Sequence, residues 1–256
     1  MPISDFTLEA YGALITCIHT NGYTISNYTD PLVEGRSCIL RHDVDFSLEM
    51  AANFAEHEQS LPKPARSTYF VLTTSDFYNP FSRAGSEAIK RIIVCGHEVG
   101  LHFDEAQYAA RDPRALIPPL LAEAERLAQV IGCPVKTVSM HRPSKMALEA
   151  NLEIPGMVNS YSERFFKEYK YLSDSRMCWR EDAEEVVSSG QYDRLHILAH
   201  PFWYAPARED TRTKLLSFIQ RGMRERYFQV KENFRNLDEF VQEQDITEEI
   251  KVKANA

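Results

Sequence analysis

The sequence is poor in cysteine and lacks any close cysteine pair. Its five cysteines are widely spaced, and none of them forms a Cys-x-x-Cys pattern (Cys17, Cys38, Cys95, Cys133 and Cys178). This spacing argues against a disulfide framework and against a zinc site built from cysteine pairs. It favours reduced, mostly buried thiols, and we therefore expect a cytoplasmic protein.

Long apolar runs are missing as well. No run reaches the roughly 18 apolar residues that a membrane-spanning helix needs. The first residues, Met1 to Phe6, show neither the basic region nor the apolar core of a signal peptide. The sequence therefore predicts no transmembrane segment and no export signal.

A surplus of positive charge is also absent. The chain has 29 Lys and Arg against 37 Asp and Glu, a net charge of −8, and no run of basic residues. This balance argues against nucleic acid as a partner. No internal repeat, low-complexity tract or linker is visible, so we expect one domain over residues 1–256.

What the chain does contain is an alternation of strand-like and helix-like segments. Helical spacing of apolar residues predicts helices near 8–18, 48–55, 89–93 and 116–131, and a helical extension at about 210–250. Short runs rich in β-forming residues predict strands at 38–41, 67–72, 98–102, 135–140, 169–173 and 195–199. This alternation is typical of an α/β protein with a parallel sheet, either closed into a barrel or doubly wound.

Nearly every predicted strand ends in residues that can bind metal or move protons. The endings are Asp43 and Asp45, His102 and Asp104, His141 and Arg142, Asp174, and His200. A barrel gathers the carboxyl ends of its strands at one mouth, where α/β barrels keep their catalytic residues. In an extended backbone Asp43 and Asp45 point the same way, so we expect both carboxylates to face this mouth.

Each of these residues also has a purely structural interpretation. Asp43 and Asp45 can cap the helix that begins near residue 48, and Arg142 can clamp a buried carboxylate. For His97, beside a glycine in a turn, we favour a structural role. His102 ends a strand level with the carboxylates, and we favour it as a ligand. The placement of so many such residues at strand ends favours a site over independent structural roles.

The ordered set resembles the polysaccharide deacetylase (NodB-homology, carbohydrate esterase) family. The five family motifs have counterparts in Arg41-His42-Asp43-Val44-Asp45, Gly96 to His102, His141-Arg142-Pro143, Lys170 to Ser175 followed by Trp179, and Leu195 to Pro201. The resemblance implies a distorted (β/α) barrel with extra N-terminal and C-terminal helices and a motif core at about 38–204. It extends to a branch associated with surface-polysaccharide and O-antigen biosynthesis.

The resemblance also implies roles for the catalytic residues. Asp43 is the expected base, and Arg142 is expected to hold its carboxylate. His200 is the expected general acid. Asp174 is expected to orient His200 and to favour its protonated form.

The expected metal site departs from the family pattern at one position. The resemblance makes Asp45 and His102 ligands, but the family places a second histidine four residues after the first, and Ala106 stands there. Alanine cannot ligate, so a third ligand must come from elsewhere. His141 is the preferred substitute and Asp104 the alternative. Two imidazoles and a carboxylate suit Zn²⁺ with an open position, and Co²⁺ or Ni²⁺ can occupy the same donors.

The resulting prediction is a metal-dependent hydrolase that removes an N-acetyl or other N-acyl group from a sugar. A cytoplasmic enzyme of this kind would act on a nucleotide-sugar or a lipid-linked glycan. Trp179 and Trp203 are candidates for stacking on the sugar, and filling of the barrel rim is an equal alternative. A second hypothesis, which Ala106 supports, is an inactive relative that binds glycan or a biosynthetic partner. A third is hydrolysis of another C–N bond, such as that of a formyl group or a small cyclic amide.

Overall fold

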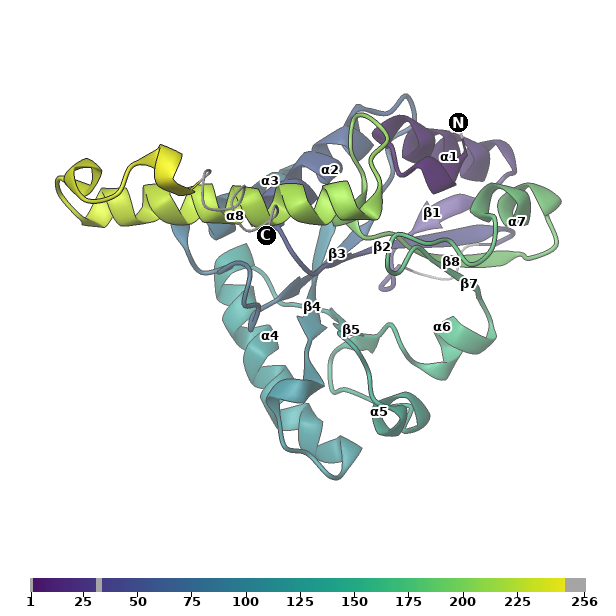
Figure 1. Cartoon of the computed structure of the whole chain (residues 1–256). Coiled ribbons are helices and arrows are strands. Elements are labelled where there is room, and N and C mark those ends of the chain that lie inside the picture. The colour runs from purple at the N-terminus through teal and green to yellow at the C-terminus, as the bar shows by residue number, and fades with distance from the viewer. Residues whose placement is uncertain (1, 31–33, 247–256) are drawn as a thin grey trace. The chain divides into compact units, whose positions relative to one another are not determined.

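The structure is a computed structural model of the chain, and it describes residues 2–30 and 34–246 (Figure 1). The chain divides into two compact units, Met1–Arg208 and Glu209–Ala256. All the motif residues named above belong to the first unit. None of the described helices is long and apolar enough to cross a membrane.

The first unit is built on one parallel sheet of eight strands. Seven strands follow in the order β6-β5-β4-β3-β2-β8-β7, and β1 pairs with β2. In the described residues no pairing joins β6 to β7, so the curled sheet forms an open barrel (Figure 1). This confirms the predicted distorted (β/α) barrel. The strands are β1 (Thr24–Ser26), β2 (Ser37–Val44), β3 (Thr68–Leu72), β4 (Glu98–Phe103), β5 (Thr137–Met140), β6 (Val158–Asn159), β7 (Lys170–Ser173) and β8 (Arg194–Leu198).

Helices lie between the strands along the chain and pack side by side. α1 contacts α2 and α7, α2 contacts α3, and α3 contacts α4. Side-chain caps fix where the first of them begin: the Thr7 hydroxyl accepts the N–H of Ala10, and Ser47 and Ser82 cap α2 and α3 in the same way. The helices are α1 (Leu8–Thr20), α2 (Leu48–Ser60), α3 (Arg83–Val94), α4 (Ile117–Ile131), α5 (Lys145–Glu149), α6 (Glu163–Lys167) and α7 (Ala183–Ser189), with short 3-10 helices at Ile3–Asp5, Glu105–Gln107, Pro113–Leu116 and Pro201–Trp203.

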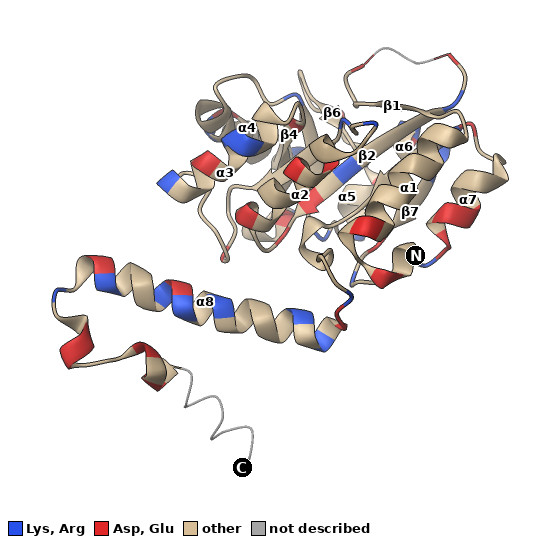
Figure 2. Cartoon of the chain, turned by 90° about the horizontal axis from the view of Figure 1, so that it is seen from above, with Lys and Arg blue, Asp and Glu red and all other residues tan. Residues whose placement is uncertain are grey.

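The central strand β2 carries charged side chains in a buried position. All eight of its residues are buried, and blue and red segments on it mark basic and acidic residues (Figure 2). Side chains along a strand alternate between its two faces. Ile39 packs in the interior cluster with Phe70, so Arg41 and Asp43 share that interior face. His42 faces the other way and lies against α2.

Sequence patterns missed the shortest elements. β1 has three residues and β6 has two, which is too few to show the two-residue period of a strand. The helices α5, α6 and α7, of five, five and seven residues, were missed for the corresponding reason. Both short strands are fixed by pairing with a longer neighbour, β2 for β1 and β5 for β6.

The second unit contains α8 (Thr211–Asn233) and a 3-10 helix at Leu237–Glu239. The helical extension predicted for about 210–250 is therefore interrupted. Asn236 adopts a positive φ of 61°, which ends the helical path before the 3-10 helix. Residues 247–250 of that prediction lie outside the described part of the chain.

Candidate active site

The carboxyl ends of the strands bring together residues that are far apart in the sequence. Asp43 lies near the end of β2, and His102 lies near the end of β4. His141, Asp174 and His200 lie directly or almost directly after β5, β7 and β8. Because all these strands are parallel, their carboxyl ends lie at one edge of the sheet.

Asp45, His102 and His141 form a group that can hold a metal ion. Asp45 Oδ1 lies 3.3 Å from His102 Nε2 and 3.2 Å from His141 Nδ1, and the two ring nitrogens are 3.1 Å apart. A tetrahedral ion with bonds of about 2.0–2.1 Å separates its ligands by about 3.3–3.4 Å, so the three donors fit such an ion. Among residues 2–30 and 34–246 no other group of three potential ligands has this arrangement.

The surrounding contacts orient these ligand atoms. His102 Nδ1 lies 3.2 Å from the carbonyl oxygen of Ser139, which assigns the ring proton to Nδ1 and leaves Nε2 facing Asp45. His141 is placed by its backbone N–H, which donates to the carbonyl of Phe103 at 2.8 Å. Burial raises the pKa of Asp45, but the rings of His102 and His141 that face its carboxylate outweigh burial and lower it. The carboxylate is therefore in the ionised form that a metal ligand requires.

The guanidinium beside Asp43 belongs to Arg41. Arg41 Nη2 donates to Asp43 Oδ2 at 2.7 Å, and the two side chains are 0% and 4% exposed. The same carboxylate oxygen lies 3.8 Å from His102 Nε2, so Asp43 borders the candidate metal group. Burial raises the pKa of Asp43, and the opposing charge of Arg41 lowers it below its ordinary value. Asp43 is thus an ionised carboxylate next to the candidate metal group.

Arg142 does not contact Asp43, which corrects the role predicted for it from the sequence. Its Nη2 donates to Asp104 Oδ2 at 2.8 Å, and its side chain is 68% exposed. The place beside Asp43 is taken by Arg41, because residues two apart in a strand share a face. Asp104, the alternative third ligand, is paired with Arg142 and is not part of the candidate metal group.

His200, whose side chain is 12% exposed, pairs with the fully buried Asp174. His200 Nδ1 lies 2.6 Å from Asp174 Oδ1, and the His200 backbone N–H donates to the carboxylate oxygens at 3.1 and 2.9 Å. Burial lowers the pKa of His200, but Asp174 outweighs burial and raises it to about 9. The other ring nitrogen, Nε2, lies 3.9 Å from Asp45 Oδ2. A protonated imidazole therefore faces the candidate metal group.

The two tryptophans predicted to bind substrate lie in different surroundings. Trp203 is only 7% exposed, and the centroid of its ring lies 4.8 Å from that of Phe202 and 6.1 Å from that of Phe46. This packing is that of a ring which fills the barrel rim. Trp179 is half-buried and keeps some free surface. Phe77, which the sequence did not single out, is 59% exposed, and its ring lies 5.2 Å from that of Phe46.

A second polar group lies on the opposite face of β2. Glu58 of α2 is fully buried and accepts hydrogen bonds from the hydroxyls of Tyr11 at 2.6 Å, Ser67 at 2.8 Å and Tyr69 at 2.6 Å. His42 Nε2 lies 3.2 Å from the same carboxylate. This group joins α1, β2, α2 and β3 behind the strand that carries Asp43, and we interpret it as structural.

His97 belongs to this structural region rather than to the candidate metal group. It is 5% exposed, its Nδ1 accepts the N–H of Ser67 at 3.2 Å, and its Nε2 lies 3.2 Å from the carbonyl oxygen of Ala55. Both ring nitrogens are therefore used by backbone groups. This placement agrees with the structural role favoured for His97 from the sequence.

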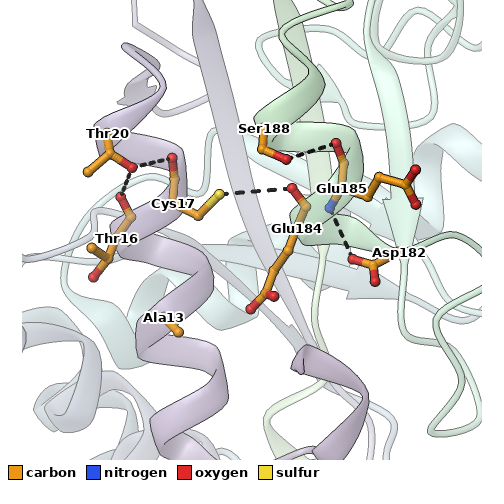
Figure 3. Close-up of a pocket in the computed structure, with 8 residues that line it drawn as sticks. All are labelled: Ala13, Thr16, Cys17, Thr20, Asp182, Glu184, Glu185 and Ser188. Atoms are coloured by element: carbon orange, nitrogen blue, oxygen red, sulfur yellow. Dashed lines mark hydrogen bonds between the residues drawn. The ribbon is translucent and has the colours of Figure 1, made fainter. Parts of the chain in front are cut away.

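A cavity of about 540 Å³ between α1 and α7 is a separate feature (Figure 3). Cys17 and Thr20 of α1 line it on one side, and Glu184 and Glu185 of α7 line it on the other. The Cys17 thiol donates to the carbonyl of Glu184 at 3.9 Å. None of the residues that line this cavity belongs to the candidate active site.

No protein-family model and no curated protein matches the chain. Similar solved structures include the chitin deacetylase from the fungal pathogen Colletotrichum lindemuthianum, at 14% identity over 72% of this chain and 81% of that chain, with a TM-score of 0.39. A family 4 acetyl xylan esterase from Clostridium thermocellum has 14% identity over 74% and 84% of the two chains, with a TM-score of 0.41. A polysaccharide deacetylase from Bacillus cereus has 14% identity over 75% and 88%, with a TM-score of 0.37. These likenesses are too distant to assign the chain to a family or an activity.

Proposed function

We propose that this chain is a metal-dependent hydrolase of the polysaccharide deacetylase type, which removes an N-acetyl or other N-acyl group from a sugar. The observation that carries the proposal is the convergence of a base, a candidate metal group and an acid. Asp43 lies 3.8 Å from the ligand atom of His102, and His200 Nε2 lies 3.9 Å from Asp45. Metal-assisted hydrolysis of an amide uses all three kinds of group.

Each residue has a distinct part in the proposed reaction. A divalent ion bound by Asp45, His102 and His141 would supply a Lewis acid for the acyl carbonyl and lower the pKa of water, and Zn²⁺, Co²⁺ and Ni²⁺ all suit these donors. Asp43 accepts the proton of the attacking water. His200 donates a proton from Nε2 to the leaving amine, because its Nδ1 is bound to Asp174.

We extend the proposal to an intracellular substrate, either a nucleotide-sugar or a lipid-linked glycan of surface-polysaccharide or O-antigen biosynthesis. The five cysteines are free, as expected in a reducing compartment, but only Cys38 is buried, so the expectation of mostly buried thiols was wrong. Trp179 and Phe77 offer flat rings of the kind that pack against sugars. Acyl release measured on N-acetylated nucleotide-sugars and on lipid-linked glycans separates the two substrate classes.

The proposal predicts that Asp43→Asn lowers turnover by about 10²–10⁴-fold, because the amide cannot take the proton of the attacking water. The measurement is acetate release from a panel of N-acetylated sugars by protein loaded with Zn²⁺, Co²⁺ or Ni²⁺. Metal content is measured in parallel and should stay unchanged. Asp76→Asn, at an exposed aspartate after β3, is the matched control and should retain wild-type turnover.

Two outcomes count against this assignment. Turnover close to that of the wild type in Asp43→Asn rejects Asp43 as the base. A metal-loaded wild type that binds glycan but releases no acyl group from any substrate rejects the hydrolase and favours the inactive, glycan-binding relative.

A second prediction concerns the acid. Asp174→Asn is expected to lower kcat by about 10²-fold or more, because an amide neither stabilises the protonated ring of His200 nor fixes which nitrogen carries the proton. KM should change little, since Asp174 is fully buried and does not reach the substrate. The check is a steady-state kcat and KM comparison with Asp182→Asn, which alters only the cap of α7. An unchanged kcat in Asp174→Asn contradicts the assigned role.

A further inference from the structure

We propose that Arg41 is the positioning residue of this site, which holds Asp43 in its reactive orientation, and that Ser160 and Tyr161 in turn hold Arg41. This inference rests on the proposed function, because it assigns a part to a residue that acts through the proposed base. The arginine that contacts the proposed base therefore belongs to β2. The motif arginine Arg142 lies in the loop after β5.

Arg41 binds Asp43 and is itself held by the residues around it. Nη2 donates to Asp43 Oδ2 at 2.7 Å and to the Tyr161 hydroxyl at 3.2 Å. Nη1 donates to Ser160 Oγ at 3.1 Å. The guanidinium also lies over the Tyr161 ring, 4.8 Å from its centroid, and over Phe70 at 5.7 Å. Hydrogen bonds within the guanidinium plane and rings beside it restrict both its position and its tilt.

Burial makes this arrangement rigid and specific. The Arg41 side chain is fully buried, and that of Asp43 is nearly so. The Ser139 hydroxyl also donates to the Asp43 carboxylate, but at 3.4 Å from both oxygens this is a weak hydrogen bond, and His102 Nε2 lies farther away, at 3.8 Å. Arg41 therefore makes the strong contact that sets the direction of the carboxylate.

Arg142 is unsuited to the same task. Its side chain is 68% exposed and binds Asp104. Its backbone has a positive φ of 51°, which is uncommon for a residue with a Cβ. The two arginines thus differ in burial and in partner, and they provide a matched pair for a test.

The test compares Arg41→Lys, Arg41→Ala and Arg142→Ala in the full chain loaded with Co²⁺. Arg41→Lys keeps a positive charge but loses the planar fork, so kcat should fall by about 10²-fold while KM changes little, as expected for a misplaced catalytic group. The Co²⁺ absorption spectrum should stay that of the wild type, since Arg41 touches no ligand atom. Guanidinium chloride at a non-denaturing concentration should restore part of the kcat of Arg41→Ala. Arg142→Ala should keep most of its kcat.

Several results would overturn the inference. One is a wild-type kcat in Arg41→Lys, and another is an equal loss in Arg142→Ala. Failure of guanidinium to raise the kcat of a folded Arg41→Ala is a third. If the Arg41 variants do not fold, the double variant Ser160→Ala/Tyr161→Phe removes two hydrogen bonds that hold the guanidinium and keeps Arg41 itself, and an unchanged kcat there rejects the proposal that Ser160 and Tyr161 hold Arg41 in position. A wild type that hydrolyses no N-acyl sugar instead rejects the proposed function, and the Arg41 assignment falls with it.

Discussion

Replacing His141 by alanine is expected to reduce the bound metal from one equivalent to none. His141 supplies one of three donors, and its Nδ1 lies 3.2 Å from Asp45 Oδ1 and 3.1 Å from His102 Nε2. Loss of a residue that only supports a ligand typically costs about 10–100-fold in metal affinity, so loss of a ligand should cost more. The measurement is metal analysis after loading with Zn²⁺ and gel filtration, with Co²⁺ absorption to report on the ligand set. Acyl hydrolysis should be lost together with the metal.

The matched control for this prediction is Asp104→Asn. Asp104 is the competing candidate for the third ligand, but its carboxylate is bound by Arg142 at 2.8 Å. Asp104→Asn should therefore keep a full equivalent of metal. The reverse result, with metal retained in His141→Ala and lost in Asp104→Asn, assigns the third ligand to Asp104. It would also mean that the close approach of the two imidazoles has no role in metal binding.

The sequence predicted the sheet well where strands and helices are long. β2, β3, β4 and β8 each have five or more residues, and the run of apolar and β-forming residues in each was sufficient to find it. The short elements were missed because a strand of two or three residues carries no readable period. Missing β6 left part of the candidate site out of the prediction. This strand leads directly to Ser160 and Tyr161, which contact Arg41, so this part of the site was not predicted.

The sequence was enough to predict which strand ends contribute residues to the candidate site. It was not enough to predict which of these side chains contact one another. Parallel strands place their carboxyl ends together, and this rule is enough to group Asp45, His102 and His141. It does not say which arginine reaches Asp43, because Arg41 and Arg142 both lie near strand ends. The spacing of Arg41 and Asp43, two residues apart in one strand, was the available signal, since it places both on one face.

The network around Glu58 could not be predicted, because its members come from four elements and share no motif. We expect Glu58→Ala to lower the free energy of unfolding by about 3–5 kcal/mol, the cost of removing one partner from a buried charged group. The hydroxyls of Tyr11 and Tyr69 and the ring of His42 would lose their common acceptor. Urea unfolding followed by tryptophan fluorescence measures the change in the first unit, which contains both tryptophans. Glu56→Ala, exposed on the same helix, removes only a surface ion pair and should cost about 0–1 kcal/mol.

The same carboxylate should make stability depend on pH. Burial raises the pKa of Glu58. The facing rings of His42 and His97 and the Tyr11 hydroxyl outweigh burial and lower the pKa from 4.5 to about 2. The Tyr69 hydroxyl also faces the carboxylate. Because the folded pKa lies below the unfolded one, the contribution of Glu58 is complete above about pH 4.5 and is lost as the pH falls toward 2. At neutral pH this contribution of Glu58 to the free energy of unfolding is about 3 kcal/mol. Unfolding free energies of the wild type and Glu58→Gln should therefore converge as the pH is lowered through this range. Curves that stay parallel would show that this carboxylate is not preferentially ionised in the folded chain.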